Sequence, residues 1–172
     1  MTAHRKLSGR LCLAIDPSTT CVGIALGVLA KPMTPNDIRY HSVISPKASN
    51  GYINRVDEIL EVLAAMRKSQ IQVPNPVCVI ECPEAFHTPK GIRAATSGAV
   101  GKLNFAVGAI YAWAKSVGMQ TLLVPVHVWK GQLPKLVVLR RLRRRGFSPD
   151  ETRGLDESDA LGLLVWTGDH HA

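Results

Sequence analysis

The chain has 172 residues, of which 46% are hydrophobic and 20% are charged, with a formal net charge of +8. This length favours one domain spanning 1–172, and the composition excludes a low-complexity chain because it supplies enough apolar side chains for a real core. The positive charge has two readings, simple solubility or a polyanionic partner such as nucleic acid.

The first half of the chain predicts a tail, three strands and a helix. The polar residues 1–9 are expected to be a flexible tail. Apolar runs bounded by turn residues predict strands, and the Pro-Ser-Thr-Thr turn joins the first two as a hairpin; the strands cover about 11–16, 21–29 and 40–44. The 3.6-residue period predicts a helix over about 52–69, whose core face is Ile53, Val56, Leu60 and Leu63.

The second half alternates strands and helices. The unbroken apolar run at 77–81 is typical of a buried parallel strand, and 121–125 is the fifth strand. Helices are predicted over about 97–117, 135–145 and 157–167, with Leu136, Leu139 and Leu142 as the core face of the second of these. This order predicts an α/β fold, a mixed five-stranded sheet with three antiparallel N-terminal strands and helices on both faces.

The four cysteines and the absence of long apolar runs favour a cytoplasmic protein. No two cysteines have Cys-x-x-Cys spacing, and three lie in predicted strands, so we interpret them as core thiols rather than a zinc site; they are Cys12, Cys21, Cys78 and Cys82. The sequence has no signal peptide and no apolar run near the ~20 residues of a membrane span. We expect a reducing, cytoplasmic setting without membrane contact.

Carboxylates stand where apolar segments end or begin. Asp16 ends the first strand and Glu81 ends the fourth, and these strands should be neighbours with both acids at one sheet edge. Asp156 and Asp159 are three residues apart at the start of the last helix, so they share one helix face. Docking that helix against the sheet edge would gather all four acids, and buried carboxylates need a partner or a metal to recover their lost hydration.

Four clustered carboxylates predict a metal-dependent phosphodiesterase. Mg²⁺ prefers oxygen ligands, and a two-metal site clamps the attacking water and the leaving oxygen of a phosphodiester. Each acid alone has a plainer reading, as a turn acid, a helix N-cap or a helix-dipole partner. Glu84 competes with Glu81 for the second ligand position. We interpret the remaining nearby acids as surface or capping residues: Asp150, Glu151 and Glu157.

A basic segment precedes the last two acids. Residues 130–149 hold Lys130, Lys135 and five arginines between 140 and 145, and no acid. The arginines can form a solvated helix face or contact phosphates, and we favour phosphate contact. The predicted DNA-binding residues are Lys90, Arg93, Lys102, Lys130, Lys135, Arg140, Arg141 and Arg144. We interpret His127 as a half-buried histidine rather than a catalyst, and Tyr111 and Trp113 as core or dimer packing.

Three segments resemble the motif blocks of RuvC-type Holliday junction resolvases, which have the RNase H-like fold. They are Ala14-Ile-Asp-Pro-Ser-Thr-Thr-Cys-Val-Gly23, Val79-Ile-Glu81 and Asp156-Glu-Ser-Asp-Ala-Leu161. Trp129-Lys-Gly-Gln-Leu-Pro-Lys135 resembles the form found in phage-encoded members. The resemblance covers about residues 11–167. One departure is that bacterial members carry an aromatic closer to the fourth-strand glutamate than Phe86 is to Glu81.

The resemblance implies a homodimeric endonuclease that nicks opposed strands of a four-way DNA junction, in a bacterial cell or a phage-infected host. It implies two Mg²⁺ ions per active site, for which Mn²⁺ can substitute. It maps the metal ligands onto Asp16, Glu81, Asp156 and Asp159, and it suggests a catalytic position for Lys130 near the scissile phosphate.

Three other functions remain open from the sequence. Another RNase H-like nuclease, acting on RNA–DNA hybrids or flaps, would use the same chemistry. Asp16-Pro-Ser-Thr-Thr20 also resembles the phosphate loop of actin-like kinases and ATPases, although those proteins need two such domains around their nucleotide. A junction or DNA binder without catalytic activity is the third.

Overall fold

The computed structural model describes residues 7–47, 50–83, 96–131, 133–149 and 155–172. These residues form a five-stranded sheet in the order β3-β2-β1-β4-β5. The strands are β1 (Leu11–Pro17), β2 (Val22–Val28), β3 (Ile38–Ile44), β4 (Val77–Cys82) and β5 (Gln120–Pro125). β2 pairs antiparallel with β1 and β3, and β4 pairs parallel with β1 and β5, which confirms the predicted mixed sheet.

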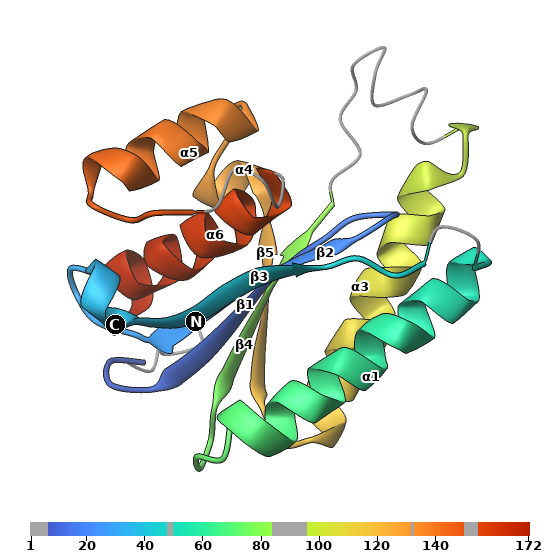
Figure 1. Cartoon of the computed structure of the whole chain (residues 1–172), viewed down its shortest axis with the longest axis horizontal. Coiled ribbons are helices and arrows are strands. Elements are labelled where there is room, and N and C mark those ends of the chain that lie inside the picture. Colours follow the sequence, from blue (N-terminus) through green and yellow to red (C-terminus); the bar gives the residue numbers. More distant parts are fainter. Residues whose placement is uncertain (1–6, 48–49, 84–95, 132, 150–154) are drawn as a thin grey trace, which may run out of the picture.

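Helices cover both faces of this sheet, as predicted (Figure 1). α1 (Tyr52–Gln70) and α3 (Ala99–Ser116) lie on one face. α4 (Val126–Trp129), α5 (Lys135–Arg144) and α6 (Leu155–His171) lie on the other. A 3-10 turn, η1 (Pro35–Asp37), precedes β3. In the part of the chain that the structure describes, no helix combines the length and apolar character needed to span a bilayer.

The sheet separates two apolar layers, and alternate residues of β1 face opposite layers. Leu13 and Ile15 pack in the layer formed with α1 and α3, whereas Cys12 and Ala14 pack in the layer formed with α5 and α6. Because side chains alternate along a strand, Asp16 continues the set of Cys12 and Ala14. Its carboxylate therefore emerges on the α6 face of the sheet.

Two predicted core positions are wrong, and each lies in the first turn of its helix. Ile53 is 63% exposed, because the buried face of α1 starts only at Val56. Leu136 is 54% exposed, since the face of α5 that packs against α6 starts at Val138. In both helices the 3.6-residue period is present, but the apolar face begins further along the chain than the first apolar residue.

Glycine in β2 lets α6 pack directly on the sheet. A Cβ at Gly23 would lie 2.1 Å from the carbonyl oxygen of Asp156, and one at Gly27 would lie 3.1 Å from Cδ2 of Leu164. Gly23 is also the ladder partner of Asp16. The first turn of α6 is thereby brought to the end of β1, where the first of the predicted site residues lies.

Candidate active site

The parallel pairing of β1 with β4 brings the first two acids together. Ile15 pairs with Ile80, so the next residue on each strand is a carboxylate, Asp16 on β1 and Glu81 on β4. Both strands end at the same edge of the sheet. The structure therefore places Asp16 and Glu81 on adjacent strands, as the sequence predicted.

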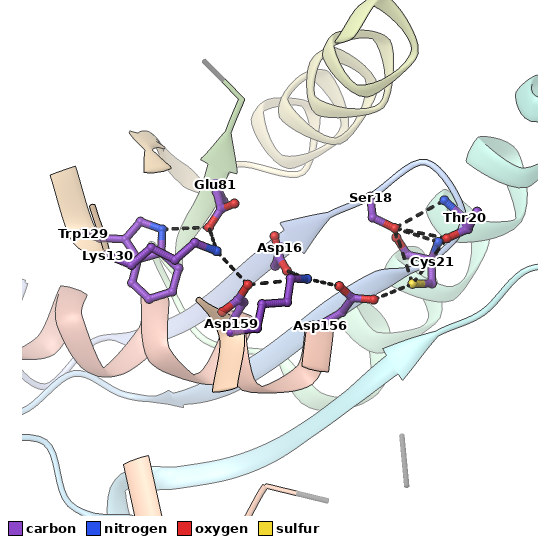
Figure 2. A network of polar contacts seen from close by, with 10 residues as sticks. Asp16, Ser18, Thr20, Cys21, Glu81, Trp129, Lys130, Asp156 and Asp159 are labelled. Carbon is purple, nitrogen blue, oxygen red and sulfur yellow. Dashed lines mark hydrogen bonds and ion pairs between the residues drawn. The ribbon is translucent and has the colours of Figure 1, made fainter. Parts of the chain in front are cut away.

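The first turn of α6 adds the other two acids. Figure 2 shows Asp156 and Asp159 facing the ends of β1 and β4, beside Asp16 and Glu81. Asp16 is 4% exposed and Asp159 is fully buried. Four carboxylates from three distant segments of the chain thus lie close together, and two of them are buried.

Two lysines bridge these carboxylates. The Nζ atom of Lys130 lies 2.6 Å from Oδ2 of Asp159 and 3.2 Å from Oε2 of Glu81. The Nζ atom of Lys135 forms an ion pair with Asp156 and lies 3.5 Å from Oδ2 of Asp159 and 3.6 Å from Oδ2 of Asp16. Each ammonium therefore partly neutralises acids from different elements.

Burial and mutual repulsion disturb the protonation of the cluster. Burial, and then the charge of Glu81, raises the pKa of Asp16 well above its usual value. Burial also raises the pKa of Glu81, and Lys130 offsets only part of that effect. For Asp156 burial is outweighed by hydrogen bonds from Cys21 and Lys135, so its pKa is lowered. The cluster as a whole is stabilised by added positive charge, as a proton or as a cation.

The donor set fits a hard divalent cation. Oδ2 of Asp16 and Oδ1 of Asp159 are buried and have no hydrogen-bond partner among the described residues. Buried carboxylate oxygens of this kind are ligands that Mg²⁺ and Mn²⁺ prefer. Within the described ranges, no three acid, histidine or cysteine side chains are already arranged around a common metal position. Because the lysine ammoniums lie among the acids, seating a cation would require them to move aside.

Trp129 is a residue of the site for which the sequence predicted no role, although it begins one of the motifs. Its Nε1 donates a hydrogen bond of 2.8 Å to Oε2 of Glu81, and the Nζ of Lys130 lies 4.8 Å from the centre of its ring. Trp129 belongs to α4, a single helical turn directly after β5, which the sequence analysis did not predict. This turn is what directs Trp129 and Lys130 towards the carboxylates.

Cys21 is also part of the site, although we interpreted it as a core thiol. Its Sγ donates a hydrogen bond of 2.8 Å to Oδ2 of Asp156, and the hydroxyl of Ser18 lies 3.4 Å from the sulfur (Figure 2). Burial and the neighbouring Asp156 raise the pKa of this thiol. The core interpretation holds for Cys12 and Cys78, which are fully buried, and Cys82 packs against the core while only partly buried.

The structure also corrects our interpretation of Glu157. We took it for a surface or capping acid, but its side chain is fully buried and contacts Nδ1 of His41 on β3. The reason is the close approach of α6 to β2 at Gly23, which packs the first turn of the helix directly on the sheet. His127, which we expected to be half-buried, is exposed on α4. Tyr111 is 36% exposed on α3.

The predicted DNA-binding residues fall into three groups. Arg140, Arg141 and Arg144 are exposed on α5, on the same side of the sheet as the carboxylates. Lys102 is exposed in the first turn of α3, on the opposite face. Lys130 and Lys135 lie within the carboxylate cluster itself. Several residues named in the sequence analysis lie outside the described residues: Glu84, Phe86, Lys90, Arg93, Asp150 and Glu151.

Comparison with known proteins shows the fold. The sequence matches no family model and no curated protein. The structure of Thermus thermophilus RuvC in complex with a Holliday junction substrate matches with a TM-score of 0.67 and 16% identity over 94% of each chain. RuvC from Thermus thermophilus in a second structure matches with a TM-score of 0.64 and 16% identity, over 93% of this chain and 94% of that one.

The yeast mitochondrial Holliday junction resolvase Ydc2 matches with a TM-score of 0.58 and 11% identity, over 96% of this chain and 80% of its own. These similarities confirm the predicted α/β, RNase H-like fold.

Proposed function

We propose that this protein is a RuvC-type endonuclease that resolves four-way DNA junctions by paired nicks, using divalent metal ions. The observation that carries the proposal is the meeting of Asp16, Glu81, Asp156 and Asp159 at one edge of the sheet. Its fold is that of resolvases, one of which has been solved with a Holliday junction substrate. An exposed arginine face on α5 beside the acids suits a DNA partner.

Mg²⁺ is the proposed cofactor, with two ions per active site, and Mn²⁺ is expected to substitute. Bound ions would supply Lewis-acid stabilisation of the attacking water and of the leaving oxygen. Asp16 is the candidate for bridging both ions, Glu81 for holding one and Asp159 for holding the other. Asp156, which is hydrogen-bonded by Cys21 and paired with Lys135, would support them from the rim.

The lysines have two proposed tasks in turn. Without metal, Lys130 and Lys135 neutralise the acids to which they are now paired. When cations take over that role, both ammoniums become available to hold phosphate oxygens of the DNA, with Lys130 nearest to the scissile phosphate. Arg140, Arg141 and Arg144 would contact the backbone of a junction arm, independently of its sequence.

The proposal includes a homodimer, because two opposed nicks need two active sites. α3 is the candidate contact surface. Phe105 is 51% exposed on this helix. Among the described residues, no atom outside the neighbouring part of α3 itself lies within 4 Å of the position of a Cβ at Gly101 or Gly108, so a second helix can approach closely. Light scattering at micromolar concentration should give the mass of a dimer, and a monomer would count against coordinated nicking.

A cleavage panel tests the function. We expect the protein to cut a labelled four-way junction in Mg²⁺ much faster than a fork, a linear duplex or an RNA–DNA hybrid, leaving 5′-phosphate and 3′-hydroxyl ends. Asp16→Asn and Glu81→Gln should abolish cleavage but preserve junction binding in EDTA. A strong preference for the hybrid or for flaps would assign the chain to another kind of RNase H-like nuclease. Thermal stabilisation by ATP without DNA binding would support the actin-like alternative.

A further inference from the structure

A cavity of about 150 Å³ lies between α5 and α6, next to the carboxylate cluster. Its lining is largely apolar and includes Leu133, Val138 and Val165, and its aromatic side chains are Trp129 of α4 and Trp166 and His170 of α6. None of the four clustered acids lines it. The cavity is therefore distinct from the candidate active site, although Trp129 and Lys130 belong to both.

The two indoles are held in place by their neighbours. Gly162 allows Trp129 to lie against α6, because a Cβ there would come within 2.9 Å of Cζ3 of the indole. Trp166 stacks on the imidazole of His170 at 4.9 Å between ring centres and 23° between ring planes. The aromatic surfaces are thus already formed without a ligand, which lowers the entropic cost of binding a flat group against them.

Three cations and one acid line this largely apolar cavity. The cations are Lys130, Arg141 and Arg145, and the acid is Asp169. Arg145 is paired with Asp169 at 2.6 Å, and Lys130 is paired with Asp159, whereas Arg141 is exposed to solvent on α5. A largely apolar cavity that is lined by two indoles and by the solvent-exposed Arg141 is complementary to a flat ring that carries a phosphate. Unpaired nucleotides have this combination of groups, and stacking on aromatic side chains beside cations is how proteins bind them.

We propose that this cavity receives one unpaired base of the DNA strand, next to the phosphate that is cut. The proposal rests on the proposed nuclease function and deepens it. Trp129 and Lys130 keep the cavity close to the carboxylates, since the same two residues line the cavity and contact Glu81. A cavity of about 150 Å³ is large enough for a single aromatic ring. A one-ring pyrimidine therefore fits better than a two-ring purine, so the cavity favours a pyrimidine at this position.

The experiment follows the indole N–H resonances of the three tryptophans by NMR while deoxycytidine monophosphate is added in EDTA. Trp129 and Trp166 should shift with saturation in the millimolar range. Trp113 lies on α3, on the other face of the sheet, and should not respond. Deoxyguanosine monophosphate should bind at least several-fold more weakly, and deoxyribose 5-phosphate, which has no base, about tenfold or more.

Matched variants separate base stacking from general charge. Trp166→Leu, which removes the aromatic face, should weaken nucleotide binding about tenfold. Arg141→Gln should weaken it several-fold, while Arg39→Gln, the same change at an exposed arginine of β3 that does not line the cavity, should leave it unchanged. Because both arginines are exposed, this comparison survives if Trp166→Leu fails to fold.

Two results would overturn the proposal that the cavity binds a base. Deoxyribose 5-phosphate could shift the two indole resonances as much as the nucleotide does, which would mean a site for phosphate alone. Alternatively, neither indole resonance could shift with the nucleotide. Neither outcome depends on cleavage. A protein that cuts junctions without any indole response keeps the nuclease function and loses the cavity. Conversely, a response without junction cleavage leaves a nucleotide site and removes the nuclease function.

Discussion

The ammonium group of Lys130 lies 2.6 Å from the fully buried carboxylate of Asp159. Removing Lys130 leaves this carboxylate only its longer contact of 3.5 Å with the ammonium of Lys135. Because leaving a buried charge with no partner costs about 3–5 kcal/mol, Lys130→Met should lower the free energy of unfolding in EDTA by somewhat less, about 2–3 kcal/mol. Saturating Mg²⁺ should restore more stability to the variant than to the wild type, because the cation replaces the missing positive charge.

Thermal unfolding with and without Mg²⁺ measures this difference. Lys102→Met, on the exposed surface of α3, is the matched control and should change stability by less than about 0.5 kcal/mol. If Mg²⁺ stabilises the Lys130 variant no more than the wild type, the cation does not bind beside Asp159.

A second prediction concerns the glycine beneath α6. Gly23→Ala would introduce a Cβ 2.1 Å from the carbonyl oxygen of Asp156, so the first turn of α6 must move. Overpacking of this kind costs about 1–3 kcal/mol, and the displaced Asp156 and Asp159 should lower junction cleavage at least tenfold. Urea unfolding and cleavage rates check both effects.

Asn54→Ala provides the control for that change. Asn54 is exposed on α1, away from α6, so alanine should change stability by no more than about 0.5 kcal/mol, in the favourable direction through helix propensity. A Gly23→Ala protein with full activity would mean that the acids of α6 tolerate displacement, and that their observed positions are not needed for cleavage.

A third prediction concerns the pair formed by His41 and Glu157. His41→Ala leaves the carboxylate of the fully buried Glu157 without its partner, which should cost about 3 kcal/mol of stability. Adding Glu157→Gln should recover part of that loss, since a neutral amide is easier to bury. A double-mutant cycle measured by denaturant unfolding should give a coupling of at least about 1 kcal/mol, and strictly additive effects would contradict the pairing.

A fourth prediction is a pH dependence at the C-terminal end of α6. Although burial acts to raise it, the pKa of Asp169 is lowered by hydrogen bonds from Arg145 and from the N–H of Met33. A lowered folded-state pKa stabilises the protein above the unfolded value of about 3.9, and this contribution is lost as the pH falls through the folded value. Because the pair is partly exposed, the effect is about 1 kcal/mol or less.

Asp169→Asn should accordingly be less stable than the wild type at pH 7, and the difference should shrink as the pH falls through 4 towards 2. Chemical unfolding at several pH values measures it. A stability difference that persists unchanged at pH 2 would show that the carboxylate charge does not contribute.

The strand-end acids could be predicted because the relevant signals are local. The apolar runs that end at Asp16 and Glu81 mark buried strands, and parallel neighbours end at the same edge. The side chains that surround these acids could not be predicted, because they depend on contacts between distant segments. Trp129 reaches Glu81 across 48 positions of sequence through the one-turn helix α4, which is too short to show a period. Glu157 lies in a capping-like sequence, and only the docking of α6 on Gly23 buries it.

The most direct measurement is the anomalous scattering of Mn²⁺ in crystals of the protein. We predict two peaks per chain about 3.5–4 Å apart, with Asp16 contacting both, Glu81 and Asp159 each contacting one, and the ammoniums of Lys130 and Lys135 moved away from the acids. An absence of any Mn²⁺ peak within bonding distance of Asp16, at a concentration that supports activity, would contradict the metal site and the chemistry derived from it.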